Sequence, residues 1–230
     1  MQLKNTWNIR SESGYRRSRN FSRPWYVYGS ELIRANLNGS RRKSALDVGC
    51  GVGEFMEILE QDGFEVTGVD GNADQIETVK NNGLEGRVVD LEKQLPFERE
   101  SFDLVTSLEV IEHIACAESL LKEINRVLKS GGHLLITTPN FAYLNHRLQY
   151  LFGAAPWNEG IHLRYFTKSR LLSCLNQTGF EVIAQKSYGP MPLVSTLMLR
   201  LLKCQPPLWC VNGHLESILA NDLIYLVKKT

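Results

Sequence analysis

The stretch that decides the fold is LDVGCGVGEF, residues 46–55, followed by VTGVD, residues 66–70. Apolar residues lead into three glycines spaced G-x-G-x-G, and a second apolar run ends on Asp70. A turn without side chains lets the backbone approach a ligand, and an acid at the tip of the next strand can hold ribose hydroxyls. The two stretches therefore predict a strand, a tight turn, a helix and a second strand, with a site for an adenosine-bearing ligand at the strand ends.

Strands and helices are predicted to alternate on both sides of this unit. Alternation of this kind favours an α/β fold with a doubly wound sheet, mostly parallel, and helices on both faces. The last two of seven strands would form an antiparallel addition. The predicted strands are 44–48, 65–69, 86–89, 102–107, 133–138, 180–187 and 222–228, and the predicted helices are 25–37, 54–61, 73–81, 117–128 and 168–178.

Composition sets limits on the class of protein. The 230 residues are 43% hydrophobic, which suits one domain over residues 1–230. With 26 basic and 25 acidic residues, no overall charge attracts the chain to nucleic acid or anionic lipid. The N-terminus lacks an apolar leader, so we expect a cytoplasmic protein with free thiols. The five cysteines have no zinc-type spacing: Cys50, Cys116, Cys174, Cys204 and Cys210.

The glycine spacing differs by one residue from the dinucleotide fingerprint G-x-G-x-x-G. Three acids also end or flank the first three predicted strands, namely Asp47, Asp70 and Asp90. Carboxyl ends of parallel strands meet at one edge, so these acids are expected together there. No lysine or arginine lies within residues 46–55, which disfavours a phosphate and favours a cationic ligand.

In these motifs the chain resembles class I S-adenosylmethionine-dependent methyltransferases of the type 11/12 kind, with some similarity to ubiquinone-biosynthesis O-methyltransferases. The resemblance continues through DLEKQLPFERESFDLVTSLEVIEHI, residues 90–114, and LLKEINRVLKSGGHLLITTPN, residues 120–140. It implies a Rossmann-like fold, a cofactor-binding core over 44–140, and methyl transfer that leaves S-adenosylhomocysteine. A subunit that binds the cofactor without chemistry is the alternative.

The resemblance also implies roles for individual residues. The backbone at Gly49, Gly51 and Gly53 would lie alongside the amino-acid moiety of the cofactor. Asp70 would bind the ribose hydroxyls. Asp47 would orient the turn or reach the amino group through water. The other expected cofactor-binding residues are Asp90 and Leu91 at the adenine, with Cys50, Gly71, Leu108 and Glu109.

The motif E-x-x-E-H, residues 109–113, offers catalytic groups. If Glu109 began a helix, Glu112 and His113 would share its face and could hold a divalent ion, with His162 as a downstream ligand. Similar patterns occur in ubiquinone-biosynthesis O-methyltransferases and in small-RNA 2′-O-methyltransferases. Magnesium suits carboxylates, and mixed nitrogen and oxygen ligation admits manganese or zinc. In the alternative, the acids support the cofactor loop without metal. His113 and His162 are the candidate catalytic bases.

The methyl acceptor is expected to contact two segments outside the core, 141–166 and 189–219. The first is rich in aromatic residues, which suits a lid stacking on a ring or sugar, or a helical cover. Residues 162–182 resemble a segment of methyltransferases associated with surface polysaccharide or glycolipid clusters. The apolar run 191–202 is too short to span a bilayer and would dock on a membrane or lipid-linked substrate, or pack in a core or dimer interface.

The first 23 residues form a polar arm in which five arginines alternate with aromatic residues. Such an arm could bind RNA through phosphates and stacked bases, or could fold over the cofactor. The expected function is O-methylation of a small-molecule acceptor, first one that contains a sugar or a lipid and second a quinone-type phenol. RNA methylation is a further alternative.

Overall fold

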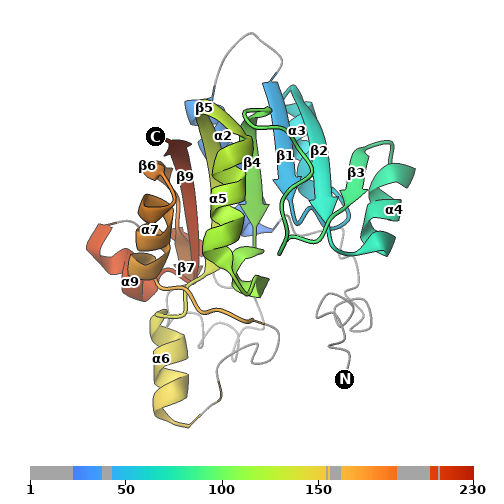
Figure 1. Ribbon diagram of the computed structural model, residues 1–230. Coiled ribbons are helices and arrows are strands. Elements are labelled where there is room, and N and C mark those ends of the chain that lie inside the picture. Colours follow the sequence, from blue (N-terminus) through green and yellow to red (C-terminus); the bar gives the residue numbers. More distant parts are fainter. Residues whose placement is uncertain (1–22, 38–42, 154, 156–161, 191–207, 212) are drawn as a thin grey trace.

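The computed structural model describes residues 23–37, 43–153, 155, 162–190, 208–211 and 213–230. A mixed sheet runs through it in the order β3-β2-β1-β4-β5-β9-β7-β8, with β6 paired to β9 (Figure 1). Its five parallel strands are β1 (Lys43–Val48), β2 (Phe64–Asp70), β3 (Glu85–Val88), β4 (Phe102–Leu108) and β5 (Leu128–Pro139).

The antiparallel part follows β5. The last strand, β9 (Asp222–Lys229), runs antiparallel to both β5 and β6 (Phe180–Gln185). The predicted fold class and antiparallel last strand are thus confirmed. The strand predicted over 180–187 instead ends at Gln185, and β7 (Tyr188–Pro190) pairs with β8 (Leu208–Cys210). These two three-residue strands raise the number in the described chain from the predicted seven to nine.

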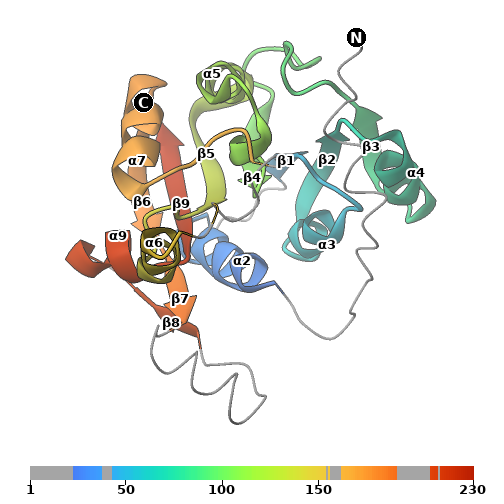
Figure 2. The same cartoon turned by 90° about the horizontal axis from the view of Figure 1, so that it is seen from below.

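Helices cover both faces of the sheet, as Figure 2 shows. One face carries α5 (Ala117–Val127) and α7 (Lys168–Gln177), and the other carries α2 (Pro24–Asn36), α3 (Glu54–Gln61) and α4 (Ala73–Asn81). The apolar stripe of α5 explains its position, because residues 117, 120, 121, 124 and 127 are all buried at helical spacing. Two separate cores result, one on each face.

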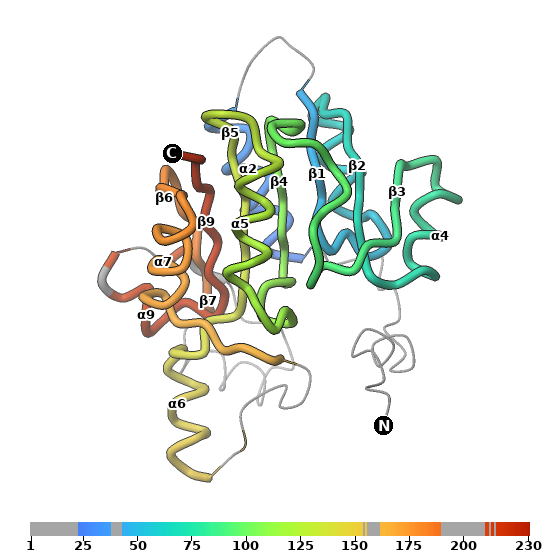
Figure 3. The backbone as a smooth tube through the Cα atoms, in the orientation of Figure 1, coloured from blue at the N-terminus to red at the C-terminus, as the bar shows by residue number. Residues whose placement is uncertain are grey.

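Shorter helices lie outside the predicted set. These are the 3₁₀ helices η2 (Ile111–His113) and η4 (Gly213–Leu215), with α6 (Leu144–Leu151) and α9 (Glu216–Leu219). The chain path in Figure 3 shows α6 extending beyond the edge where the parallel strands end. This edge is the lower one in Figure 1, where the arrowheads of β1, β2 and β4 point. The loops after these strands therefore meet there and form the candidate site.

Several sequence predictions fall on residues that are not described. These are the arm up to residue 22 and the apolar run 191–202. Among the described helices, none has the length and apolar character needed to cross a bilayer. Four cysteines are free thiols, as expected, and Cys204 lies outside the described residues.

Candidate active site

The glycine turn between β1 and α3 is fixed by hydrogen bonds to β2. Gly49, Gly51 and Gly53 all have positive φ, at 73°, 57° and 86°, where a residue with a Cβ is strained. The amide of Gly49 donates to the Val69 carbonyl at 2.7 Å, and the amide of Gly51 donates to the Asp70 carboxylate at 3.0 Å. The turn and the acid predicted to act together are thus in direct contact.

The surroundings of two of these glycines differ. A Cβ added to Gly49 would lie 2.3 Å from Val110 Cγ2, so packing against the loop after β4 excludes any larger residue there. A Cβ added to Gly51 would have Gln75 Oε1, at 3.8 Å, as its nearest neighbour. The backbone at Gly51 is therefore accessible, and a ligand can approach it without a side chain in the way.

Two buried acids lie behind the turn. Asp47 on β1 is 3% exposed and accepts a hydrogen bond from Thr106 Oγ1 at 2.6 Å. Burial raises the pKa of Asp47 to about 7, and the negative charge of Asp70 adds to this, although the Thr106 hydrogen bond opposes it. A cationic ligand would relieve the repulsion between the two carboxylates, whereas a phosphate would increase it. The site therefore fits the ammonium and sulfonium of S-adenosylmethionine.

The remaining expected cofactor residues lie along the same edge. Gly71 directly follows β2, and Leu108 is the last residue of β4. Asp90 lies two residues beyond β3, where its half-exposed carboxylate is 3.3 Å from Lys93 Nζ. Leu91 is buried in the core on the α5 face. The thiol of Cys50 is also buried, and this burial raises its pKa above the usual range, so it stays protonated.

Glu109 differs from its predicted position. It has φ of 58°, outside the helical region, and the helix that follows is a single 3₁₀ turn beginning at Ile111. Its carboxylate accepts a hydrogen bond from Thr137 Oγ1 at 2.7 Å. The prediction that Glu109 begins a helix and shares its face with Glu112 and His113 is therefore wrong, because a left-handed residue turns the chain before the helix starts.

The other three predicted metal ligands do come together. Ligand atoms of Glu112, His113 and His162 lie within 4.8 Å of one another, and the cluster does not include Glu109. Backbone amides of Leu163 and Arg164 donate to the Glu112 carbonyl at 2.9 and 3.0 Å, which brings the distant segment against η2. His113 Nε2 is 3.7 Å from Glu112 Oε1. One carboxylate and two imidazoles form a donor set for a mixed nitrogen and oxygen site.

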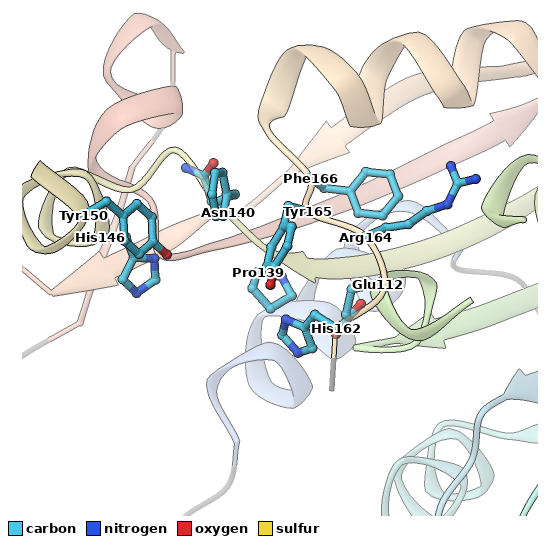
Figure 4. Close-up of a pocket in the computed structure, with 10 residues that line it drawn as sticks. Glu112, Pro139, Asn140, His146, Tyr150, His162, Arg164, Tyr165 and Phe166 are labelled. Atoms are coloured by element: carbon cyan, nitrogen blue, oxygen red, sulfur yellow. The ribbon is translucent and has the colours of Figure 1, made fainter. Parts of the chain in front are cut away.

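A pocket opens beside this cluster (Figure 4). Glu112 and His162 lie at one end, and His146 and Tyr150 of α6 lie at the other. Aromatic rings pack between these ends: Phe141 stacks on Tyr150 with centroids 5.2 Å apart and contacts Tyr165 at 4.7 Å. The full lining is Glu112, Pro139, Asn140, Phe141, His146, Tyr150, His162, Arg164, Tyr165 and Phe166.

Two polar residues of this pocket already have partners. Asn140 Nδ2 donates to the carbonyls of Ala220 and Ser217, and its Oδ1 accepts from the Ala142 amide. The Arg164 guanidinium binds the Ala115 carbonyl and both carboxylate oxygens of Glu118. Both side chains therefore hold the fold together around the pocket. The other polar side chains of its lining are one carboxylate, two imidazoles and two phenols.

Sequence reasoning singled out neither His146 nor Tyr150. Both lie in the insertion predicted to face the acceptor, and the only signal was its richness in aromatic residues. They reach the pocket because Tyr143, at the N-cap of α6, is buried and fixes the start of the helix. Burial lowers the pKa of His146, which keeps its imidazole neutral at pH 7.

The buried carboxyl of Asp47 predicts a pH-dependent stability of the ligand-free protein. Its pKa is about 7 in the folded state against 3.8 for an ordinary Asp, so the folded state binds more protons between these values. Stability should therefore fall as pH rises from about 4 to 7, by at most about 1.4 kcal/mol per pH unit. Denaturant unfolding at several pH values measures this.

Asp47→Asn is the matched variant for this measurement. It should flatten the decline between pH 4 and 7, leaving the smaller slope expected from Asp222, another buried acid whose pKa is raised to about 6. An unchanged slope in Asp47→Asn would show that Asp47 is ionised in the folded protein throughout this range.

Comparison with known proteins agrees with this geometry. A family model described as a methyltransferase domain matches residues 16–185. The ubiquinone biosynthesis O-methyltransferase of Rickettsia prowazekii is 30% identical over 192 residues, which cover 77% of this chain and 73% of that protein. The enzyme of the same name from Idiomarina loihiensis is 31% identical over 164 residues, covering 66% and 68%.

Solved structures show the same fold. A methyltransferase from Thermotoga maritima, described as a possible histamine N-methyltransferase, aligns with a TM-score of 0.63 at 20% identity over 89% of each chain. The 1,6-didemethyltoxoflavin-N1-methyltransferase of Burkholderia thailandensis, solved with S-adenosylhomocysteine bound, aligns with a TM-score of 0.64 at 16% identity over 100% and 92%. The chain belongs to the class I S-adenosylmethionine-dependent methyltransferase family and is an enzyme of that family.

Proposed function

We propose that this enzyme methylates a hydroxyl group on an aromatic ring of a small molecule. The observation that carries the proposal is the pocket in which Glu112 and His162 face a wall of aromatic side chains. A polyhydroxylated sugar needs many hydrogen-bonding partners, and the side chains of Asn140 and Arg164 are committed elsewhere. A flat ring with one or two ionisable hydroxyls matches a lining in which aromatic rings lie between a carboxylate and imidazoles. The quinone-type phenol is therefore favoured over the sugar-containing acceptor.

The relatives support the same class of reaction. Those from R. prowazekii and I. loihiensis are named as O-methyltransferases of ubiquinone biosynthesis, and we extend the O-methylation of a small molecule to this chain. We do not extend the acceptor of these relatives to this chain, because the segments expected to contact the acceptor lie outside the cofactor-binding core.

For the cofactor we propose the following arrangement. The glycine turn would lie alongside the amino-acid moiety, with the exposed backbone of Gly51 nearest to it. Asp70 would bind the ribose hydroxyls. Asp47 would supply negative charge behind the amino-acid moiety, and Asp90 and Leu91 would lie at the adenine. When bound, S-adenosylmethionine supplies a methyl group already activated by its positive sulfur.

The protein's remaining task is then to orient the acceptor and remove its proton. The acceptor hydroxyl would give its proton to the imidazole of His162 or His113 as its oxygen bonds to the methyl carbon and the carbon–sulfur bond breaks. Glu112 stabilises the imidazolium that forms. A divalent cation held by Glu112, His113 and His162 is the second arrangement these residues allow, and it would lower the pKa of a bound hydroxyl.

The test is methyl transfer from labelled S-adenosylmethionine to matched acceptors. We expect transfer to a dihydroxybenzene and none to its dimethoxy derivative, to a methyl glycoside or to a short RNA. Transfer to the glycoside or the RNA alone would contradict the aromatic acceptor. Binding of S-adenosylmethionine without transfer to any of these acceptors, or to any component of an added metabolite extract, would favour a non-catalytic subunit. Repeating the assay after chelation, with magnesium, manganese or zinc restored separately, decides whether a metal takes part.

A further inference from the structure

Three carboxylates of the site each accept a hydrogen bond from a buried threonine. Thr106 donates to Asp47 at 2.6 Å, Thr137 donates to Glu109 at 2.7 Å, and Thr138 donates to Glu112 at 3.2 Å. The three threonine side chains are completely inaccessible to solvent. A hydroxyl fixes the direction of a carboxylate without neutralising it, whereas a lysine or arginine would cancel its charge.

The contact between Thr137 and Glu109 is reciprocal. Thr137 Oγ1 accepts a hydrogen bond from the Glu109 amide at 3.0 Å and donates one to the Glu109 carboxylate. This closed pair holds both the backbone and the side chain of a residue whose φ is 58°. Such a conformation is costly for a residue other than glycine and persists where the surroundings enforce it.

Thr137 and Thr138 are neighbours on β5, so their side chains point to opposite faces of the sheet. Leu135, on the same face as Thr137, belongs to the core that also contains α2 and α3. Ile136, on the same face as Thr138, belongs to the core with Ile111 and Phe166. Since the glycine turn leads into α3, the face of Thr137 is the one beside the proposed cofactor site, and the face of Thr138 is the one beside the aromatic pocket.

Glu109 directly precedes a residue that contacts the glycine turn in space. The next residue, Val110, packs so tightly against Gly49 that a Cβ at this glycine would overlap it. We infer that Thr137 is a positioning residue that directs Glu109 toward the charged amino-acid end of the cofactor, while Thr138 holds Glu112 on the acceptor side. The two acids of the E-x-x-E motif then serve different ligands. This inference rests on the proposed cofactor site and not on the identity of the acceptor.

The test compares two isosteric substitutions on neighbouring residues of one strand. Calorimetry with S-adenosylhomocysteine should show affinity about five- to tenfold weaker in Thr137→Val, the loss expected for one buried hydrogen bond, and unchanged affinity in Thr138→Val. Thr137→Ser keeps the hydroxyl and should restore most of the affinity. Both valine variants lose one hydroxyl from a fully buried site, so a general loss of stability would weaken binding in both.

A second variant shows whether Thr137 acts through Glu109. Glycine tolerates the backbone conformation of Glu109, so Glu109→Gly should fold while binding the cofactor more weakly. In that background Thr137→Val should cause no further loss of affinity. Equal losses in both valine variants, failure of Thr137→Ser to restore binding, or a full additional loss in the Glu109→Gly background would each overturn the inference. If the wild-type protein fails to bind S-adenosylhomocysteine, the proposed cofactor site itself is wrong.

Discussion

The Glu112→Gln substitution is expected to lower the turnover rate about 100-fold or more. The affinity for S-adenosylhomocysteine should stay within about twofold of the wild-type value. Glu112 is 2% exposed and lies in the cluster with both histidines, so its negative charge acts on them at close range in a poorly solvated site. Glutamine keeps the size of the side chain but removes that charge. Steady-state turnover and calorimetry on the same preparation measure the two effects.

His162→Asn should give a similar loss, because the imidazole is the proposed proton acceptor or metal ligand. The matched control is His133→Asn, which changes a histidine in the middle of β5. Its pKa is lowered by burial and by nearby Lys228 and Lys43, and it lies six residues before Pro139, the end of the strand at the site. His133→Asn should retain wild-type turnover. Near-normal turnover in both Glu112→Gln and His162→Asn would remove the cluster from the mechanism.

Gly51→Ala is expected to weaken cofactor binding by about 100-fold or more while the protein still folds. Among the described residues the added methyl meets only Gln75 Oε1, at 3.8 Å, so it enters the space proposed for the amino-acid moiety of the cofactor. The φ of 57° adds a strain of about 1 kcal/mol to the folded state. Calorimetry with S-adenosylhomocysteine and denaturant unfolding separate the two effects.

Gly63→Ala provides the control for backbone strain. Gly63 also has positive φ, at 86°, and a Cβ there would meet no other described residue within 4 Å. It lies in the turn between α3 and β2, at the other end of α3 from the glycine turn. Gly63→Ala should therefore lose a similar amount of stability and keep cofactor affinity. Equal affinities in the two variants would place the cofactor away from Gly51.

Most of the cofactor-binding core followed from the sequence. Its strands and helices carry hydrophobic periodicity, and the glycine turn and Asp70 occur at separations that a βαβ unit dictates. The predicted helix at 25–37 and the first four parallel strands agree with the structure within one residue, whereas β5 begins at Leu128, five residues before the predicted start. Local signals suffice there because the chain alternates regularly between strand and helix.

The predictions were weaker where contacts join distant segments. The strand predicted over 180–187 splits at Lys186, because β7 leaves β6 to pair with β8 about 20 residues later, which no local pattern indicates. The 3₁₀ turn after β4 was missed for a similar reason, since the left-handed Glu109 is held by Thr137 from another strand. The role of α6 was not foreseen because no residue of this helix is fully buried, so it lacks the apolar stripe of a core helix.

The sequence by itself determined the fold class, the methyl donor and the edge of the sheet where we propose that it binds, because glycine spacing and strand-end acids are local features. Only the tertiary structure decided which residues of the E-x-x-E-H motif lie together and which lie apart. It separates Glu109 from Glu112, brings His162 to His113 across about 50 residues, and places His146 and Tyr150 on the pocket. These groupings depend on the opposite faces of β5 that Thr137 and Thr138 occupy, and on the segment after residue 161 that packs against η2. Such long-range packing has no periodic signature in the sequence.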